Sequence, residues 1–287
     1  MIGVFDSGLG GLTVLRALHE RFPHTPFLYL ADHAHVPYGN RPAEEVVNLT
    51  RIGVERLFSA GCRLVLLGCN TATAVAARAL QRQWLPASGW GGHNILGIVA
   101  PTVEAATQTP YAVTTPQYPQ KYNTDLIAVF GTTRTIAAGV YPEEIRKRCP
   151  RVEVVQQACP GLAGAIEAEA AETEIAGMIE AAVSELLSRT GGAPPHRAIL
   201  GCTHYPLVEA VFRRHLPVFT RLLSQPEIVA DSLEDYLARH PHYLAGAHPQ
   251  PTSSRPHLTL WTTGEPADAS RRARIFWVDA PPFVHAG

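Results

Sequence analysis

Short apolar runs alternate with amphipathic segments along most of this 287-residue chain. The runs are rich in Val, Ile and Leu, are bounded by Gly, Pro or polar residues, and predict strands at 2–5, 27–30, 63–68, 95–99, 126–130, 152–156, 197–201 and 258–262. The clearest helix is predicted over 172–190, where apolar residues recur at spacings of three and four. Because strands that alternate with helices form βαβ units, the sequence predicts an α/β fold of mostly parallel sheets flanked by helices.

Some segments lack this periodicity. Residues 86–94 and 109–124 are rich in Pro, Gly, Thr, Gln and Tyr, and they predict loops on the surface. Residues 240–256 predict a linker or a mobile loop. The last ten residues, 278–287, show neither period, and we expect a flexible tail there.

An internal repeat is the more informative feature. Residues 2–7 are echoed by 127–132, and 65–71 are echoed by 198–204. Two buried strands resemble each other easily by chance, but both members of the second pair continue into Gly-Cys followed by hydroxyl, amide or imidazole side chains. The repeat indicates two related lobes that face each other across a cleft, each presenting one cysteine, Cys69 or Cys202.

The setting of these two cysteines differs from that of the others. Cys69 and Cys202 each follow a predicted strand and precede a predicted helix, with Pro206 well placed at a first helical position. Ligands of open α/β sheets bind at such strand ends, and helix N-termini favour thiolates and carboxylates. A free cysteine is more often a small buried hydrophobe, and we interpret Cys62 and Cys149 in that way.

Two thiols on one cavity suit the inversion of a carbon that carries an acidic proton. One thiolate removes the proton from one face and one thiol supplies a proton to the other, and the roles exchange in the reverse direction. A free thiol titrates near pH ~8.5, so modest tuning is enough, and the pair is expected to titrate as a coupled unit. Pyridoxal phosphate needs a Schiff-base lysine, and the only lysines, Lys121 and Lys147, lie in unpromising settings. We therefore expect no cofactor.

Composition and charge exclude several other classes. The formal net charge is −1 and the basic residues are scattered, so a nucleic-acid partner is not expected. No apolar run approaches the ~20 residues of a membrane-spanning helix, and the N-terminus lacks the pattern of a secretory signal. The five cysteines include no CxxC pair, so no metal site is expected. These features predict a cytoplasmic protein.

A glycine-rich turn at 6–11 provides a second site signal. Its glycines permit close approach of the backbone to a ligand, although the spacing matches neither GxGxxG nor a phosphate-binding loop. Residues 4–8, Val-Phe-Asp-Ser-Gly, also resemble the opening of the aspartate-nucleophile phosphatases. Gly8 replaces their second aspartate, so this class is a distant alternative.

The motifs together resemble the glutamate racemase family of the aspartate/glutamate racemase superfamily. The matching pieces occur in family order over most of residues 2–210: GVFDSGLGGLT (3–13), VPYG (36–39), GCNTAT (68–73), GTTRT (131–135), QACP (157–160) and LGCTHYP (200–206). The resemblance implies two pseudo-symmetric α/β domains, 1–98 plus 212–277 and 99–211, with the active site between them. It also implies a homodimer and cofactor-independent conversion of L-glutamate to D-glutamate for peptidoglycan synthesis.

The resemblance also implies roles for individual residues. Cys69 acts on the D-enantiomer and Cys202 on the L-enantiomer, assisted by Asp6, by His204 and by the acidic Glu167. The residues expected to bind the small-molecule substrate are Asp6, Ser7, Tyr38, Gly39, Asn70, Thr71, Thr203 and His204. Taken singly, Asp6 is more typical of a helix cap, His204 of a satisfied interior histidine and Glu167 of a solvated helix face. The matching motifs beside them reverse this for Asp6 and His204 and leave the two interpretations of Glu167 balanced.

Departures from the family pattern leave two alternatives open. The chain has Ala-Asp-His-Ala-His at 31–35, Gly-Leu-Ala-Gly-Ala at 161–165 and alanine at Ala138, where the family commonly has other residues. One alternative is a racemase for aspartate or another acidic amino acid. The other is a protein that has lost catalysis and binds a ligand or a protein partner, although both cysteines, Asp6 and His204 argue against it.

Overall fold

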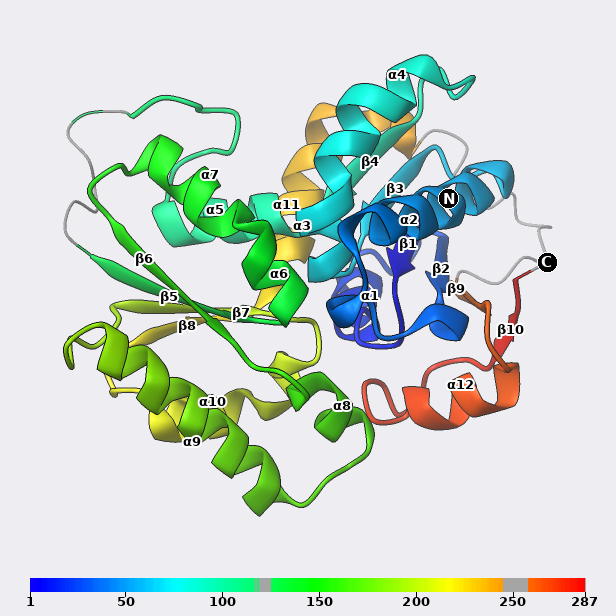
Figure 1. Ribbon diagram of the computed structural model, residues 1–287. Coiled ribbons are helices and arrows are strands. Elements are labelled where there is room, and N and C mark those ends of the chain that lie inside the picture. The colour runs from blue at the N-terminus through cyan, green and yellow to red at the C-terminus, as the bar shows by residue number, and fades with distance from the viewer. Residues whose placement is uncertain (117, 119–124, 245–257, 287) are drawn as a thin grey trace.

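Two parallel sheets organise the chain (Figure 1), whose computed structural model describes residues 1–116, 118, 125–244 and 258–286. The first sheet has the order β10-β9-β2-β1-β3-β4. Its strands are β1 (Ile2–Asp6), β2 (Phe27–Ala31), β3 (Leu64–Leu67), β4 (Asn94–Gly97), β9 (Leu258–Thr262) and β10 (Phe283–His285). The second sheet has the order β6-β5-β7-β8 and consists of β5 (Leu126–Gly131), β6 (Glu153–Ala158), β7 (Arg197–Gly201) and β8 (Arg221–Leu223).

The two sheets repeat one topology. β1 lies between β2 and β3, as β5 lies between β6 and β7. On the far side of β3 the sheet continues with β4, and on the far side of β7 it continues with β8. Every pairing among the described strands is parallel. The two central strands are wholly buried, which is why they read as continuous apolar runs. The predicted α/β class with two pseudo-symmetric halves is confirmed.

Helices cover both faces of each sheet (Figure 1). In the first lobe these are α1 (Leu12–Arg21), α2 (Ala43–Ser59), α3 (Asn70–Ala79), α4 (Leu85–Ala87), α11 (Gln225–Arg239) and α12 (Pro266–Ala273). In the second they are α5 (Val99–Thr107), α6 (Thr133–Ala138), α7 (Val140–Arg148), α8 (Leu162–Glu167), α9 (Glu172–Arg189) and α10 (Glu209–His215). Short helical turns complete the set: η1 (His33–His35), η2 (Tyr38–Asn40), η3 (Leu80–Trp84), η4 (Tyr205–Val208) and η5 (Pro241–Tyr243).

Each lobe has a separate apolar core on either side of its sheet. In the first lobe α1, α11 and α12 pack on one face, and α2 and α3 pack on the other. In the second lobe α8, α9 and α10 cover one face, while α5 and α7 cover the other. None of the helices in the described part of the chain is long and apolar enough to span a bilayer.

Two expectations about chain segments are wrong. Strand β8 belongs to the second sheet, so the second lobe extends to residue 223 rather than ending at 211. Residues 283–285, expected to lie in a flexible tail, form β10 beside β9, and Ala286 beyond them is buried. Both strands have three residues, which is too short for a period to be recognised in the sequence.

The predicted loops agree with the structure where it describes them. Residues 109–116 contain no helix or strand. Of the predicted loop at 86–94, residues 88–93 form bends and turns, whereas the first two residues belong to α4 and the last one begins β4. The predicted loop at 240–256 begins with η5, and its residues 245–256 lie outside the described residues, as do 117 and 119–124 of the second loop. The predicted helix at 172–190 is α9.

Candidate active site

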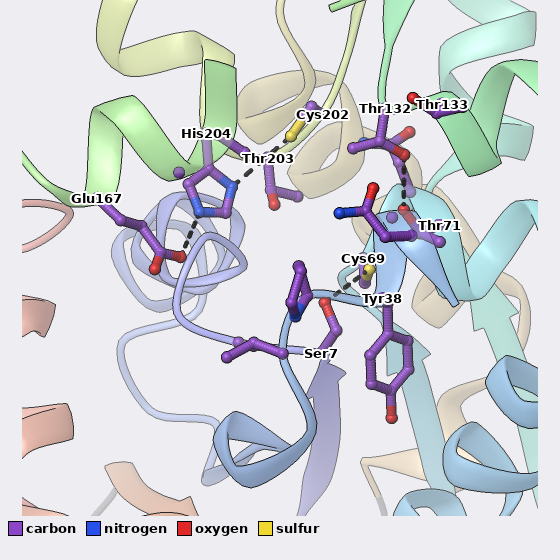
Figure 2. A pocket seen from close by; sticks show the side chains of 18 of the residues that line it. Ser7, Tyr38, Cys69, Thr71, Thr132, Thr133, Glu167, Cys202, Thr203 and His204 are labelled. Carbon is purple, nitrogen blue, oxygen red and sulfur yellow. Dashed lines mark hydrogen bonds and ion pairs between the residues drawn. The ribbon is translucent and has the colours of Figure 1, made fainter. Parts of the chain in front are cut away.

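One cavity of about 400 Å³ lies between the two lobes, at the carboxyl ends of strands from both sheets (Figure 2). Chains that leave parallel strands at this edge supply the usual ligand site of α/β folds. Residues of the first lobe that line it are Ser7, Gly8, Val36, Pro37, Tyr38, Gly39, Asn40, Cys69, Asn70 and Thr71. Those of the second lobe are Thr132, Thr133, Pro160, Gly161, Ala163, Gly164, Glu167, Cys202, Thr203 and His204.

Cys69 occupies the N-cap position of α3, immediately after β3. Its sulfur accepts a hydrogen bond from the Ala72 N–H at 3.4 Å and lies 3.2 Å from the Ser7 hydroxyl. Burial, with a smaller contribution from the nearby Asp6 charge, raises the pKa of the Cys69 thiol to about 12, although the Ala72 and Ser7 hydrogen bonds oppose the rise. Cys69 is therefore a neutral thiol at neutral pH, ready to donate a proton.

Asp6 lies behind this thiol and does not line the cavity. Its carboxylate accepts hydrogen bonds from the Gly11 N–H and, at 3.2 Å, from the Tyr29 hydroxyl. The Ser7 hydroxyl lies 3.4 Å from the same carboxylate. Burial raises the pKa of Asp6, in spite of the hydrogen bond from Gly11. Asp6 thus influences the cavity through Ser7 and Cys69 and makes no direct contact with it.

Cys202 is supported by a different set of groups. Its sulfur lies 3.6 Å from His204 Nδ1, and His204 Nε2 lies 2.7 Å from Glu167 Oε1 (Figure 2). Burial lowers the pKa of His204, but a negative charge on Cys202 and the Glu167 carboxylate outweigh burial and raise the pKa to about 10. Burial likewise raises the pKa of Glu167, yet the partnership with His204 holds it below its usual value.

The helix expected directly after Cys202 begins later. Residues Tyr205–Val208 form the short turn η4, which contains Pro206, and α10 starts at Glu209. The sulfur of Cys202 therefore does not cap a helix in the way that Cys69 does. Its side-chain partner is the imidazole of His204, which stands at the position that the repeat relates to Thr71 in the first lobe.

The two thiols face the same cavity from opposite lobes (Figure 2). The internal repeat relates Cys69 to Cys202 and Ser7 to Thr132, whereas it relates Asp6 to a glycine, Gly131. One side thus pairs a neutral thiol with a hydroxyl and a buried carboxyl. The other side pairs a thiol with a charged imidazole. Such an arrangement can remove a proton from one face of a bound carbon and supply one to the other.

The glycine-rich turn after β1 provides the close approach of the two lobes. A Cβ atom on Gly10 would lie 2.5 Å from ring atoms of His204 and 2.5 Å from Thr203 Oγ1. Beside it, the Thr13 hydroxyl lies 3.0 Å from the Thr203 carbonyl oxygen. Glycine at position 10 therefore lets the start of α1 pack directly against the residues that follow Cys202.

Tyr38 contributes a wall of the cavity, not a hydroxyl. Its ring is almost wholly buried, and its hydroxyl donates to Asp32 Oδ2 at 2.6 Å, pointing away from the thiols (Figure 2). Asp32 is also bonded to His35 and Thr263, each at 2.8 Å. This cluster fastens the loop of η1 and η2, whose residues 36–40 border the cavity, to the end of β9.

Two threonines of the second lobe were missed as site residues. Thr132 and Thr133 line the cavity, and the Thr132 hydroxyl lies 3.1 Å from that of Thr71 across the lobes. The Thr71 hydroxyl is also 3.2 Å from that of the buried Thr135. The repeat contained the signal, because it places Thr132 opposite Ser7 in the pseudo-symmetry. Of the residues singled out in the sequence, all but Asp6 line the cavity.

The remaining cysteines belong to the apolar cores. Cys62 packs under α2 and α3, Cys149 packs beside α5 and α7, and Cys159 packs under α8 and α9. Burial raises the pKa of Cys62 and of Cys159 to about 12. Within the described ranges, no group of three His, Cys, Asp or Glu side chains is arranged to hold a metal ion.

Comparisons with known proteins agree with this geometry. No protein-family model matches the chain. The curated glutamate racemases of Phenylobacterium zucineum and of a Caulobacter species are each 48% identical to it over 280 residues, which cover 96% of this chain and 96% of each relative. The crystal structure of glutamate racemase isoform RacE1 from Bacillus anthracis aligns with a TM-score of 0.80 at 26% identity, covering 99% of this chain and 96% of that one.

Proposed function

The chain belongs to the glutamate racemase family, and from that premise we propose that it inverts the α-carbon of glutamate with Cys69 and Cys202 as its two acid/base groups. The observation that carries the proposal is the position of the two thiols. They stand at repeat-related places in opposite lobes, and both border one cavity. A two-base inversion needs this geometry, because the departing and arriving protons occupy opposite faces of the carbon.

The groups around each thiol favour a particular resting state. An imidazolium at His204, held by Glu167, stabilises a thiolate on Cys202 by charge and by a hydrogen bond from Nδ1. Cys69, in contrast, rests as a thiol because burial opposes its charge. The resting enzyme is then prepared for L-glutamate: Cys202 removes the α-proton, and Cys69 donates a proton to the opposite face.

The reverse direction uses the same groups with exchanged roles. After one inversion Cys69 is the thiolate, and hydrogen bonds from Ser7 and from the Ala72 N–H stabilise it. A D-glutamate molecule loses its α-proton to Cys69 and receives a proton from Cys202. Each half of the site therefore supports both protonation states of its thiol, with different partners on the two sides.

Polar groups of both lobes are available for the two carboxylates and the ammonium group of the substrate. The N-terminus of α3 favours an anion, and its residues Asn70 and Thr71 line the cavity. Opposite them lie Thr132, Thr133 and Thr203. These donors stabilise the carbanion that forms at the α-carbon. Lys147 is not placed to form a Schiff base with pyridoxal phosphate in the cavity, because it is paired with Glu143 and Glu144 and does not line the cavity. We infer a reaction that uses no pyridoxal phosphate.

The product of the proposed reaction indicates which pathway the enzyme serves and where it works in the cell. D-Glutamate is a component of peptidoglycan, and we infer that the enzyme supplies it in the cytoplasm as a homodimer. Light scattering on purified protein measures the molar mass of the particle in solution and so tests the homodimer. A mass of one chain at micromolar concentration argues against the dimer.

A comparison of substrates tests the proposed specificity. Purified protein without added cofactor is incubated separately with D-glutamate, D-aspartate and D-alanine, and the appearance of the L-enantiomer is followed by chiral chromatography. We expect inversion of glutamate to be the fastest by a wide margin. Faster inversion of aspartate contradicts the substrate, and no inversion of any of the three by folded protein contradicts the activity.

A further inference from the structure

A buried pair of amides joins the cavity wall to the interior of the protein. Asn70 lines the cavity directly after Cys69, and its Nδ2 donates to Gln225 Oε1 at 2.5 Å. In return Gln225 Nε2 donates to Asn70 Oδ1 at 3.2 Å. Gln225 is completely buried, Asn70 is 2% exposed, and Gln225 does not line the cavity. The two residues are 155 positions apart in the chain, so only the fold brings them together.

Gln225 stands where the chain crosses between the lobes. The first crossing is at Ile98, between β4 and α5, and the second is at Ser224, between β8 and α11. The Nε2 atom of Gln225 lies 2.8 Å from Thr102 Oγ1 on α5 and 3.5 Å from the Ile98 carbonyl oxygen. One side chain therefore connects both crossings with the wall of the substrate cavity.

The hydrogen bonds fix which way each amide points. The Thr102 hydroxyl donates its single hydrogen to the Ile98 carbonyl at 2.7 Å, so its oxygen can only accept. The group of Gln225 that faces it must then be the NH2, which leaves Oε1 directed at Asn70. Because Oε1 is an acceptor, Asn70 must turn its own NH2 toward it. A helix carbonyl thus sets the orientation of a side chain in the substrate site, through two intermediate residues.

The same network determines what Asn70 can offer to a ligand. Asn70 Oδ1 accepts from the Tyr141 hydroxyl at 2.7 Å and faces Gln225 Nε2 at 3.2 Å, a donor that is also 3.2 Å from the Tyr141 oxygen, so both sides of Oδ1 are turned toward protein donors. Of the two Nδ2 hydrogens, one is given to Gln225. Asn70 is left with one N–H and no free acceptor, so it can donate to a carboxylate but cannot accept from an ammonium group.

We propose that Gln225 is a positioning residue for racemization, which holds the Asn70 amide so that a single N–H donor is presented to a carboxylate of the substrate. The proposal rests on the proposed function, since it assigns one contact within the same site. Without Gln225 the Asn70 amide can rotate, and an oxygen then faces the carboxylate for part of the time. Substrate binding weakens in consequence, while the two thiols keep their positions.

Two substitutions interrupt the network at different points. Gln225→Met keeps the length of the side chain and removes its hydrogen bonds, and we expect it to raise the KM for glutamate about tenfold with little change in kcat. Thr102→Val removes the acceptor that orients Gln225, and we expect a smaller increase in KM, about threefold. The second variant leaves the amide pair in place, so it keeps the test meaningful should Gln225→Met fold poorly.

Thr107→Val is the matched control. Thr107 is a buried threonine of the same helix, and its hydroxyl makes the same bond to a carbonyl one turn back, at 2.7 Å from Val103 O. Among the described residues its hydroxyl bonds to the carbonyl oxygens of Val103 and Thr109, and not to Gln225 or Asn70. Removal of its hydroxyl affects stability as Thr102→Val does, but we expect the KM to stay within about twofold of the wild type. An equal rise in KM for both threonine variants would mean that the effect comes from the packing of α5 and would contradict the role of Thr102 in orienting Gln225.

The decisive measurement is a double-substitution cycle. If Gln225 acts by orienting Asn70, then Gln225→Met has no further effect on the KM of the Asn70→Ala enzyme. An additional tenfold rise in that background, or an unchanged KM for Gln225→Met alone, overturns the proposal. Wild-type racemization of glutamate is measured first, so failure of the proposed function is recognised before any variant is compared. Circular dichroism verifies that each variant is folded at the assay temperature.

Discussion

The Nε2 atom of His204 lies 2.7 Å from Glu167 Oε1, on the opposite side of the ring from Cys202. The carboxylate stabilises a positive imidazole, and the positive imidazole stabilises a thiolate. On the Cys69 side the described neighbours of the sulfur are the Ser7 hydroxyl and the N–H of Ala72, and the carboxyl of Asp6 lies behind Ser7, with no imidazole between them. The two halves of the site are therefore related by fold but differ in electrostatics.

Replacement of Glu167 by glutamine tests the relay through the pH profile. The pKa of His204 is raised to about 10, so its charge is present at neutral pH and is lost as pH rises through that value. Glu167→Gln removes part of the cause, and we expect the alkaline limb of kcat/KM to move to lower pH by about one unit or more. Glu172→Gln, at an exposed ion pair with Arg214 in the same lobe, is the control. An unmoved alkaline limb in Glu167→Gln contradicts the relay.

The difference between the thiols is also accessible to chemical labelling. Cys69 and Cys202 are both 5% exposed, so access does not distinguish them. Because the pKa of Cys69 is raised to about 12, its thiolate is scarce at pH 8, whereas the sulfur of Cys202 lies 3.6 Å from the imidazole of His204, the kind of partner that activates a thiol. Brief treatment with iodoacetamide, followed by peptide mass spectrometry, is expected to modify Cys202 first. Preferential modification of Cys69 at pH 8 would reverse this assignment.

A methyl group at Gly10 is expected to displace the histidine. The added Cβ would lie 2.5 Å from the His204 ring, so the ring or the start of α1 must move. A displacement of about 1 Å in a catalytic group costs about a hundredfold in rate, and we expect a loss of that order in kcat/KM for Gly10→Ala. Gly177→Ala, at an open position within α9, serves as the control with full activity. Equal activity of the two variants would refute the close approach.

The hydroxyl of Thr132 is expected to serve both substrate binding and helix stability. It lies 3.1 Å from the Thr71 hydroxyl, and it caps α6 by accepting from the Thr135 N–H at 3.2 Å. Thr132→Val is expected to raise the KM for glutamate about tenfold and to lower the free energy of unfolding by about 1 kcal/mol. Thr132→Ser keeps the hydroxyl and is expected to restore both quantities. Loss of stability with an unchanged KM would show that the Thr132 hydroxyl caps α6 but does not take part in substrate binding.

Much of this site follows from local sequence. The repeat pairs Cys69 with Cys202, and the apolar runs before them place both thiols at strand ends, as the structure has them. The helix over 172–190 and the strand pattern are clear because their periods extend over many residues. The same repeat relates Ser7 to Thr132, and both residues line the cavity.

Other features depend on contacts between distant segments. Tyr38 lines the cavity as expected, but its hydroxyl donates to Asp32, which Thr263, 231 positions away from Asp32, also binds. Gln225 has no local pattern that relates it to Asn70, because the pairing joins α3 to α11 across 155 positions of the chain. The boundary of the second lobe depends on β8, whose three residues contain no period of their own. Sequence periodicity reports burial within an element, and it does not report which elements meet.

Exchange of the α-hydrogen in D2O tests the two-base assignment most directly. Wild type, Cys69→Ala, Cys202→Ala and the core control Cys149→Ala are incubated separately with L- and D-glutamate, and chirality and α-deuterium are measured together. The wild type and the control are expected to invert both enantiomers with incorporation of deuterium. Cys69→Ala is expected to exchange the α-hydrogen of L-glutamate alone, and Cys202→Ala that of D-glutamate alone, in both cases without inversion. Full racemization by either of these two variants would contradict the account.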